Sequence, residues 1–120
     1  NHLALNYLGY SMLIEDKNID EAFTLIQKAV TLEPENGAYL DSLGWAYYKK
    51  GKYKLAEKYL IKAEKKEFDP EIYEHLGYVY YSMNNPIKAI YWWARCLEFT
   101  PKQEISEMIE KAKQQLSPKK

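Results

Sequence analysis

The residues of this chain with the clearest chemical potential lie between positions 71 and 75. Glu71, Glu74 and His75 fall within one predicted helical turn, and carboxylates with an imidazole can bind Zn²⁺ or Ni²⁺. A catalytic metal site needs about three firm ligands and further groups that orient those ligands. No such supporting set accompanies these residues. We therefore interpret them, with Asp41 nearby, as solvated surface charge, and we expect no metal ion and no cofactor.

The single cysteine, Cys96, could act as a nucleophile, but its position favours a packing role. It follows two tryptophans and occupies a slot that holds alanine in two earlier copies of a repeated pattern. A small residue beside large rings is more often buried than reactive. The sequence also lacks a glycine-rich phosphate loop, a nucleophile elbow and a pair of metal-binding histidines. We predict that the chain is not an enzyme.

Composition and charge are those of an ordinary folded domain. Of 120 residues, 47% are hydrophobic, and 17 basic residues balance 17 acidic ones, so no global field favours nucleic acid. No apolar run approaches the roughly 18 residues of a membrane span, and no secretory leader opens the chain. The compartment stays open between cytoplasm and bacterial periplasm. Because the first residue is Asn1 and a helical pattern is running by Leu3, we expect a fragment with more repeats upstream.

Three copies of one helix-hairpin pattern account for most of the chain. The glycines of the copies, Gly9, Gly44 and Gly77, lie 35 and 33 residues apart, each within an apolar helical stripe. A glycine inside a helix costs about 1 kcal/mol relative to alanine. Three glycines in register therefore indicate that two helices cross closely at each one. A repeat of this kind cannot bury its apolar face alone, so the copies must stack.

Local signals set the boundaries of the predicted elements. Gly51 suits a left-handed helix end, and Asp69 and Asn85, each followed by proline, suit helix starts. Thr100 has the spacing of a capping box at the start of a final amphipathic helix. The predicted organisation is repeat 1 at 1–36, repeat 2 at 37–69, repeat 3 at 70–100, a capping helix at 101–116 and a tail at 117–120.

Residues 40–63 closely resemble a tetratricopeptide repeat. They read Leu-x-x-Leu-Gly-Trp-Ala-Tyr-Tyr from Leu40, then Gly-x-Tyr-x-x-Ala from Gly51, with a further alanine at Ala63. The flanking copies resemble the family more loosely, and the run from Tyr39 to Trp45 is similar to late repeats of large bacterial repeat proteins. The resemblance implies an all-α fold, a right-handed α-α superhelix of three helix hairpins plus one capping helix. It also implies a scaffold that binds other proteins.

The resemblance further implies that the first helix of each repeat lines a concave groove. Positions six before, three before, one after and four after each glycine share one helical face. The groove residues selected in this way are Asn6, Tyr10, Asp41, Trp45, Tyr48, Glu71, Glu74, Tyr78 and Tyr81. Rigid aromatic residues are typical of peptide-binding hot spots. We therefore predict a mildly acidic, aromatic groove for a partner peptide or helix. The alternative is that these rings pack on one another between repeats.

Two further functional alternatives follow from the resemblance. Family members that clamp the carboxylate ends of chaperones place Lys, Asn and Arg along the groove. The matching positions here are Asn6, Tyr10, Ser42, Glu71 and His75. None is Lys or Arg, and Glu71 would repel a carboxylate, so we predict that this chain is not such a clamp. The chain could instead be a structural or self-assembly segment of a longer repeat protein, self-associating through its exposed repeat ends.

The aromatic residues near position 92 are divided between the core and the surface. Trp92 and Trp93 are adjacent, so only one of them can face the inner stripe. Trp93 matches the apolar stripe of the earlier repeats, and we place it in the core. We expect Trp92 under the final helix, with a convex interface as the second choice. Tyr91 points further outward and is interpreted as a lone surface aromatic.

Overall fold

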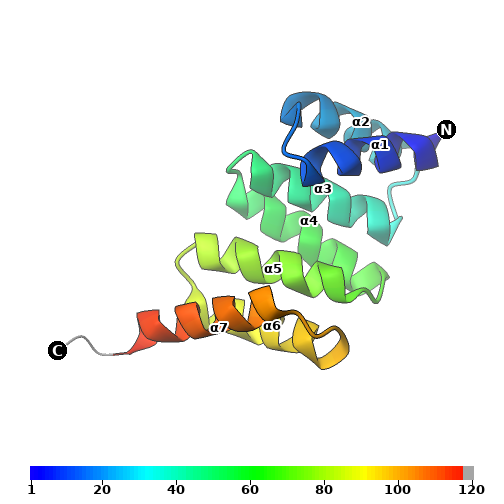
Figure 1. Ribbon diagram of the computed structural model, residues 1–120. Coiled ribbons are helices and arrows are strands. Elements are labelled where there is room, and N and C mark those ends of the chain that lie inside the picture. The colour runs from blue at the N-terminus through cyan, green and yellow to red at the C-terminus, as the bar shows by residue number, and fades with distance from the viewer. Residues whose placement is uncertain (118–120) are drawn as a thin grey trace. The chain divides into compact units, whose positions relative to one another are not determined.

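The computed structural model describes residues 1–117, and this part of the chain contains seven α-helices and no strand. The expected all-α helical repeat fold is confirmed. The predicted tail reaches beyond the described residues at 118–120. The helices are α1 (His2–Ile14), α2 (Ile19–Leu32), α3 (Gly37–Lys49), α4 (Tyr53–Lys66), α5 (Pro70–Ser82), α6 (Pro86–Phe99) and α7 (Gln103–Leu116), as Figure 1 shows.

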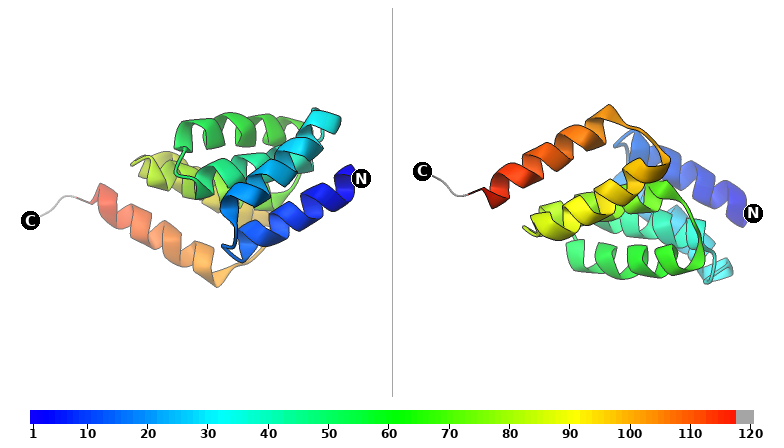
Figure 2. Two further views of the ribbon diagram at one scale, coloured as in Figure 1. Left: turned by 90° about the horizontal axis from the view of Figure 1, so that it is seen from above. Right: turned by 90° about the horizontal axis from the view of Figure 1, so that it is seen from below.

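The chain forms two compact units, Asn1–Phe68 and Asp69–Lys120. In the first unit, α1 pairs with α2 and α3 pairs with α4, and α3 also packs against α1 and α2. In the second unit, α6 packs against both α5 and α7, so these three helices lie one against the next (Figure 2). The first unit thus contains two helix hairpins, and the second contains one hairpin and the single helix α7.

Side chains at the helix starts supply the hydrogen-bond acceptors that the first backbone N–H groups require. The side chain of Asn36 accepts from the Tyr39 N–H at 3.0 Å, and the side chain of Asp69 accepts from the Glu71 N–H at 3.0 Å. Asn85 does the same for α6, which opens with proline as expected. The predicted left-handed glycine is also confirmed, since Gly51 has a φ of 77°.

The start of α7 differs from the prediction. Its N-cap residue is Lys102, without a side-chain cap, and the helix begins at Gln103. Thr100 does not form a capping box, because it is the extended residue that ends α6. A residue in that conformation stops one helix and leaves Pro101 to bridge to the next.

The predicted close helix crossings are confirmed at the three repeat glycines. A Cβ atom added at Gly9 would lie 2.7 Å from Cγ1 of Ile26, and one at Gly44 would lie 2.6 Å from Cγ of Leu60. At Gly77 the added atom would overlap the indole ring of Trp93. These distances are below van der Waals contact, so only glycine lets the second helix of each hairpin approach this far.

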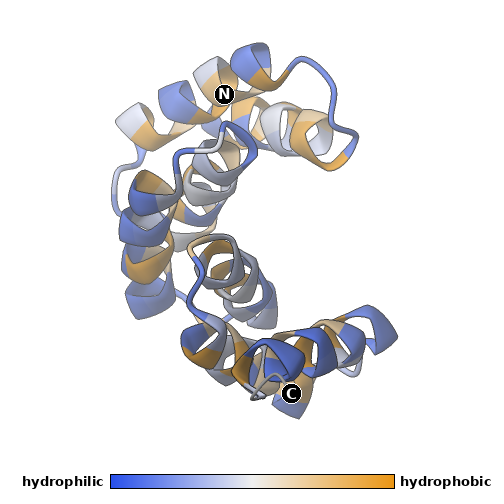
Figure 3. Cartoon of the chain, turned by 90° about the vertical axis from the view of Figure 1, so that its left-hand side faces the viewer, coloured by the Kyte–Doolittle hydropathy of each residue, from blue (hydrophilic) through white to orange (hydrophobic). Residues whose placement is uncertain are grey.

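Burial follows the stripes that the sequence indicates. The stripe alanines of the second helices are fully buried, as are Trp93 and Leu60; these alanines are Ala22, Ala29, Ala56, Ala63 and Ala89. Cys96 is buried, as predicted for a packing residue. Hydrophobic and hydrophilic residues follow one another along the helices, which Figure 3 shows as orange and blue segments.

Candidate functional site

Two candidate groove residues of α3, Trp45 and Tyr48, form a stacked aromatic pair in the first unit. The rings of Trp45 and Tyr48 are stacked, with centroids 4.4 Å apart and planes 7° from parallel. The Nζ of Lys49 lies 5.6 Å from the Trp45 ring centroid, and the same amine donates to Asp16 Oδ1 at 2.8 Å. Trp45 is only 8% exposed, whereas Tyr48 is half-buried. This packing gives the pair a fixed orientation, and Tyr48 is its more accessible ring.

The candidate residues of α1, Asn6 and Tyr10, lie one turn apart and are half-buried. The side-chain carbonyl oxygen of Asn6 is buried and accepts no hydrogen bond from any described residue. An acceptor that is withdrawn from water without a donor costs on the order of 1–3 kcal/mol.

In the second unit, α7 and the residue before it bind three of the four candidate residues of α5. Lys102, just before α7, donates to Glu74 Oε1 at 2.7 Å. The hydroxyl of Tyr78 donates to Glu104 Oε1 at 3.2 Å. The hydroxyl of Tyr81 accepts from Gln115 Nε2 at 3.0 Å. The remaining candidate, Glu71, is exposed.

The two α5 tyrosines also share one aromatic support. Tyr78 meets the edge of Trp93 with ring centroids 5.2 Å apart, and Tyr81 lies 5.6 Å from the same ring. Trp93 is held in turn by its indole N–H, which donates to the Glu74 carbonyl at 3.2 Å. The aromatic part of this surface is therefore built around a buried tryptophan and is bordered by polar groups of α7.

Part of the charged cluster near position 75 is not solvated, contrary to the interpretation from sequence. Asp41 is 5% exposed and His75 is 4% exposed, and Ser42 is also buried. Asp41 lies on α3, which has buried residues around most of its circumference. Among the acids of this cluster, only Glu71 is open to solvent.

A cavity of about 310 Å³ lies beside Glu74, between the start of α5 and the end of α6. Its lining residues are Asp69, Pro70, Glu71, Glu74, Cys96, Thr100 and Lys102. Burial, with the negative charge of Glu74, raises the pKa of the Cys96 thiol above its ordinary value, so the thiol is protonated and a poor nucleophile at neutral pH. The hydrogen bond to Glu74 raises the pKa of Lys102 and keeps that amine charged.

Sequence reasoning missed the part of this site that α7 and the residue before it supply. Lys102, Glu104 and Gln115 lie in a segment whose polar residues the sequence pattern assigns only to the solvent face of a capping helix. A polar residue on an amphipathic helix has the same sequence signature whether it meets water or a neighbouring tyrosine, so no signal in the chain separates the two cases.

Within residues 1–117, no cluster of three or more His, Cys, Asp or Glu side chains is arranged to hold a metal ion. In the same part of the chain, none of the helices has the length and apolar character that crossing a membrane requires.

Comparison with known proteins shows which repeat family the chain is similar to. Residues 37–63 match the family model of the tetratricopeptide repeat. A tetratricopeptide repeat-containing protein of Pseudomonas aeruginosa is 44% identical over 77 residues. That alignment covers 64% of this chain and 13% of the relative, so the chain spans a small part of the length of the curated protein it matches. Neither of these two matches indicates a catalytic family.

Solved structures show the same fold at low sequence identity. The first tetratricopeptide repeat domain of Spaghetti (RPAP3) has a TM-score of 0.87 and 22% identity, and the match covers 98% of this chain and 94% of that one. The Yersinia enterocolitica type III secretion chaperone SycD has a TM-score of 0.78 and 17% identity, covering 95% and 93%. The repeat match and the bacterial relative support a protein of the tetratricopeptide repeat family, and the solved structures show the same all-α repeat fold.

Proposed function

We propose that the chain is a protein-interaction module that binds an extended or helical segment of a partner protein on the candidate face of its first helices. The observation that carries the proposal is the stacked pair on α3, in which buried Trp45 holds the partly exposed Tyr48 ring in a fixed orientation. Rigid rings lose little conformational entropy when a ligand packs on them.

Two structural neighbours support a role in peptide binding. The Spaghetti (RPAP3) domain is bound to the HSP90 peptide SRMEEVD, and SycD is in complex with a peptide of the translocator YopD. Both share the fold of this chain at identities that do not carry over their ligands. They support the class of function, a peptide held by a repeat domain.

The charges favour a ligand that is apolar, neutral or basic. Glu71 is exposed, Glu104 borders Tyr78, and Lys102 already pairs with Glu74. A ligand carboxylate would therefore meet negative charge, and the nearby lysine is occupied. A clamp for an acidic chain end such as the HSP90 peptide is not the proposed activity.

The test is capture of partners from a native bacterial lysate by the wild-type chain and by a Tyr48→Ala, Tyr81→Ala double variant. Both tyrosines are half-buried, so their loss disturbs the fold less than the loss of buried Trp45. Tyr59→Ala, on α4, is the matched aromatic control. We expect a partner that the control retains and the double variant loses, with unchanged helicity. A partner retained by all three proteins contradicts this assignment of the surface.

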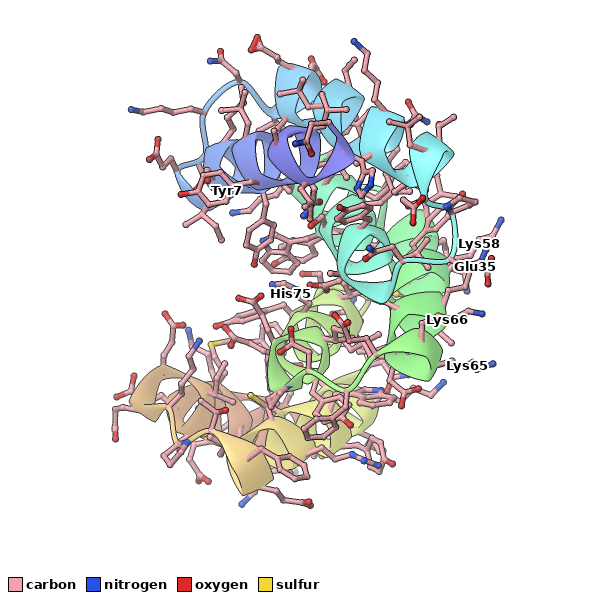
Figure 4. All side chains as sticks on the ribbon, turned by 90° about the vertical axis from the view of Figure 1, so that its right-hand side faces the viewer. Tyr7, Glu35, Lys58, Lys65, Lys66 and His75 are labelled. Carbon is pink, nitrogen blue, oxygen red and sulfur yellow. The ribbon has the colours of Figure 1, made fainter. Side chains whose placement is uncertain are left out.

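Exposed apolar residues on α1 favour a second candidate function, stacking against another repeat. Leu3 is 64% exposed, Leu8 is 53% exposed and Tyr7, labelled in Figure 4, is 76% exposed. One repeat later, the residue in the place of Leu8 is Leu43, which is 3% exposed where α3 packs against α1 and α2. The exposed face of α1 that carries Leu8 thus has the apolar character of the α3 face that is buried by packing against a neighbouring repeat.

Sedimentation at increasing concentration tests whether a second copy covers the α1 face. Self-association that disappears in Tyr7→Lys would support the structural role. A monomer at every concentration would exclude self-association through this face, and it would leave the groove proposal untouched, because Tyr7 is not one of the candidate groove residues.

A further inference from the structure

The outward ridge of α6 carries a row of large side chains that lie outside the candidate groove. Ile87, Tyr91, Arg95 and Phe99 follow one another at intervals of four residues, so they form one ridge along the helix. Ile87 is 67% exposed, Tyr91 52% and Phe99 50%. Tyr91 is therefore part of a row and not the lone surface aromatic expected from sequence.

The second repeat carries a different set of residues on the equivalent ridge. The residues 33 positions earlier, on α4, are all exposed lysines: Lys54, Lys58, Lys62 and Lys66. In Figure 4, Lys58 and Lys66 extend outward from that helix. The repeat architecture therefore does not require apolar residues here. Three large apolar side chains on the α6 ridge, where α4 has only lysines, mark a surface that makes contacts of its own.

Arg95 at the centre of the ridge is held in place by aromatic rings. Its guanidinium carbon lies 5.0 Å from the ring centroid of Tyr73, 5.8 Å from that of Tyr91 and 5.9 Å from that of Trp92. Nη1 donates to the Tyr91 hydroxyl at 3.1 Å. The Tyr73 and Trp92 rings stack with centroids 5.6 Å apart, so Trp92 packs on α5 and supports Arg95.

The charge of Arg95 has only neutral partners in the part of the chain that the structure describes. Its partners within residues 1–117 are tyrosine hydroxyls and aromatic rings, and its buried Nε has no hydrogen-bond acceptor among these residues. A guanidinium that is fixed by rings and partly removed from water is a preorganised partner for a carboxylate, because its planar fork matches the two oxygens.

From this combination we propose that the α6 ridge is a docking surface for an amphipathic helix of a partner protein. The partner helix places a carboxylate on Arg95 and apolar side chains one turn to either side, against Tyr91 and Phe99. The charge on the ridge selects the carboxylate, and the spacing of four residues matches successive turns of a bound helix. This surface belongs to α6 and is independent of the groove proposal, whose residues lie on α1, α3 and α5.

The probe is a synthetic amphipathic helix that carries one glutamate with a leucine one turn away on each side, and its control is the same peptide with glutamine. NMR of the three tryptophan indole N–H groups locates the binding. We expect the Trp92 signal to shift while the Trp45 signal stays constant. The glutamine peptide should bind about tenfold more weakly or worse, as expected for loss of a charged hydrogen bond.

The decisive comparison replaces ridge residues of α6 with lysine, which is the residue at the matching positions of α4. Tyr91→Lys and Phe99→Lys should abolish binding, whereas Lys58→Ala on α4 should leave binding unchanged. In Arg95→Gln the preference for glutamate over glutamine should vanish, a readout that a general loss of packing would not produce. Equal binding of the two peptides to the wild type, a shift of Trp45 in place of Trp92, or no binding at millimolar peptide would each overturn the proposal.

Discussion

Replacing Gly77 with alanine tests the close helix crossing at the centre of the second unit. The new Cβ atom would overlap the indole of Trp93, which is fully buried and has no space into which to move. Overpacking of this kind costs about 1–3 kcal/mol. If Trp93 shifts, its 3.2 Å hydrogen bond to the Glu74 carbonyl is also weakened, at about 1 kcal/mol. The higher helix propensity of alanine offsets about 1 kcal/mol of this loss in the free energy of unfolding.

The expected net effect of Gly77→Ala is a loss of about 1–3 kcal/mol in the free energy of unfolding, or a Tm lower by roughly 4–10 °C for a domain of this size. Thermal and urea unfolding followed by far-UV circular dichroism measure this effect. Ala94→Gly, at an exposed position of α6, is the matched control, because it reports the helix propensity difference without a close contact.

A double-mutant cycle with Trp93→Leu isolates the contact itself. A leucine side chain can rotate away from the added methyl group, so Gly77→Ala should cost at least about 1 kcal/mol less in the leucine background. If Gly77→Ala is as stable as the wild type or more stable, or if the cycle shows no coupling, then the glycine does not serve a close crossing and this account of the repeat core is wrong.

Three further predictions concern local chemistry. Because burial raises the pKa of Cys96 above its ordinary 9.0, a thiol reagent at about pH 9 should label the native chain slowly and the unfolded chain quickly; fast native labelling would contradict its burial. The pKa of Lys102 is raised above 10.5, so the stabilisation from its pair with Glu74 is present below pH 10.5 and is lost as pH rises further. Lys102→Gln should therefore lower the free energy of unfolding by less than about 1 kcal/mol at neutral pH, because the lysine is partly exposed. At strongly alkaline pH the substitution should have no measurable effect. Unfolding curves of both proteins at the two pH values measure the difference. Gly51→Ala should cost about 1 kcal/mol through its left-handed backbone although no atom lies within 4 Å of the new methyl group, and a variant as stable as the wild type would argue against that conformation.

The elements of the fold were predictable because their causes are local. Helix periodicity, the caps at Asp69 and Asn85, and the left-handed position of Gly51 each depend on residues a few positions apart. The crossings at the repeat glycines were predictable for a different reason. A glycine inside a helix has a cost that only a close neighbour offsets, so its repetition in register indicates a contact that is distant in sequence.

The composition of the candidate surfaces was decided by tertiary packing. Nothing in the sequence distinguishes Glu104, which receives the Tyr78 hydroxyl, from the other glutamates of α7. The burial of His75 and the cage of rings around Arg95 likewise depend on residues from other turns and other helices. By itself, then, the sequence determined which segments are helical and where they cross. Only the three-dimensional packing decided which polar side chains leave water, because that choice depends on neighbours that the helical period does not specify.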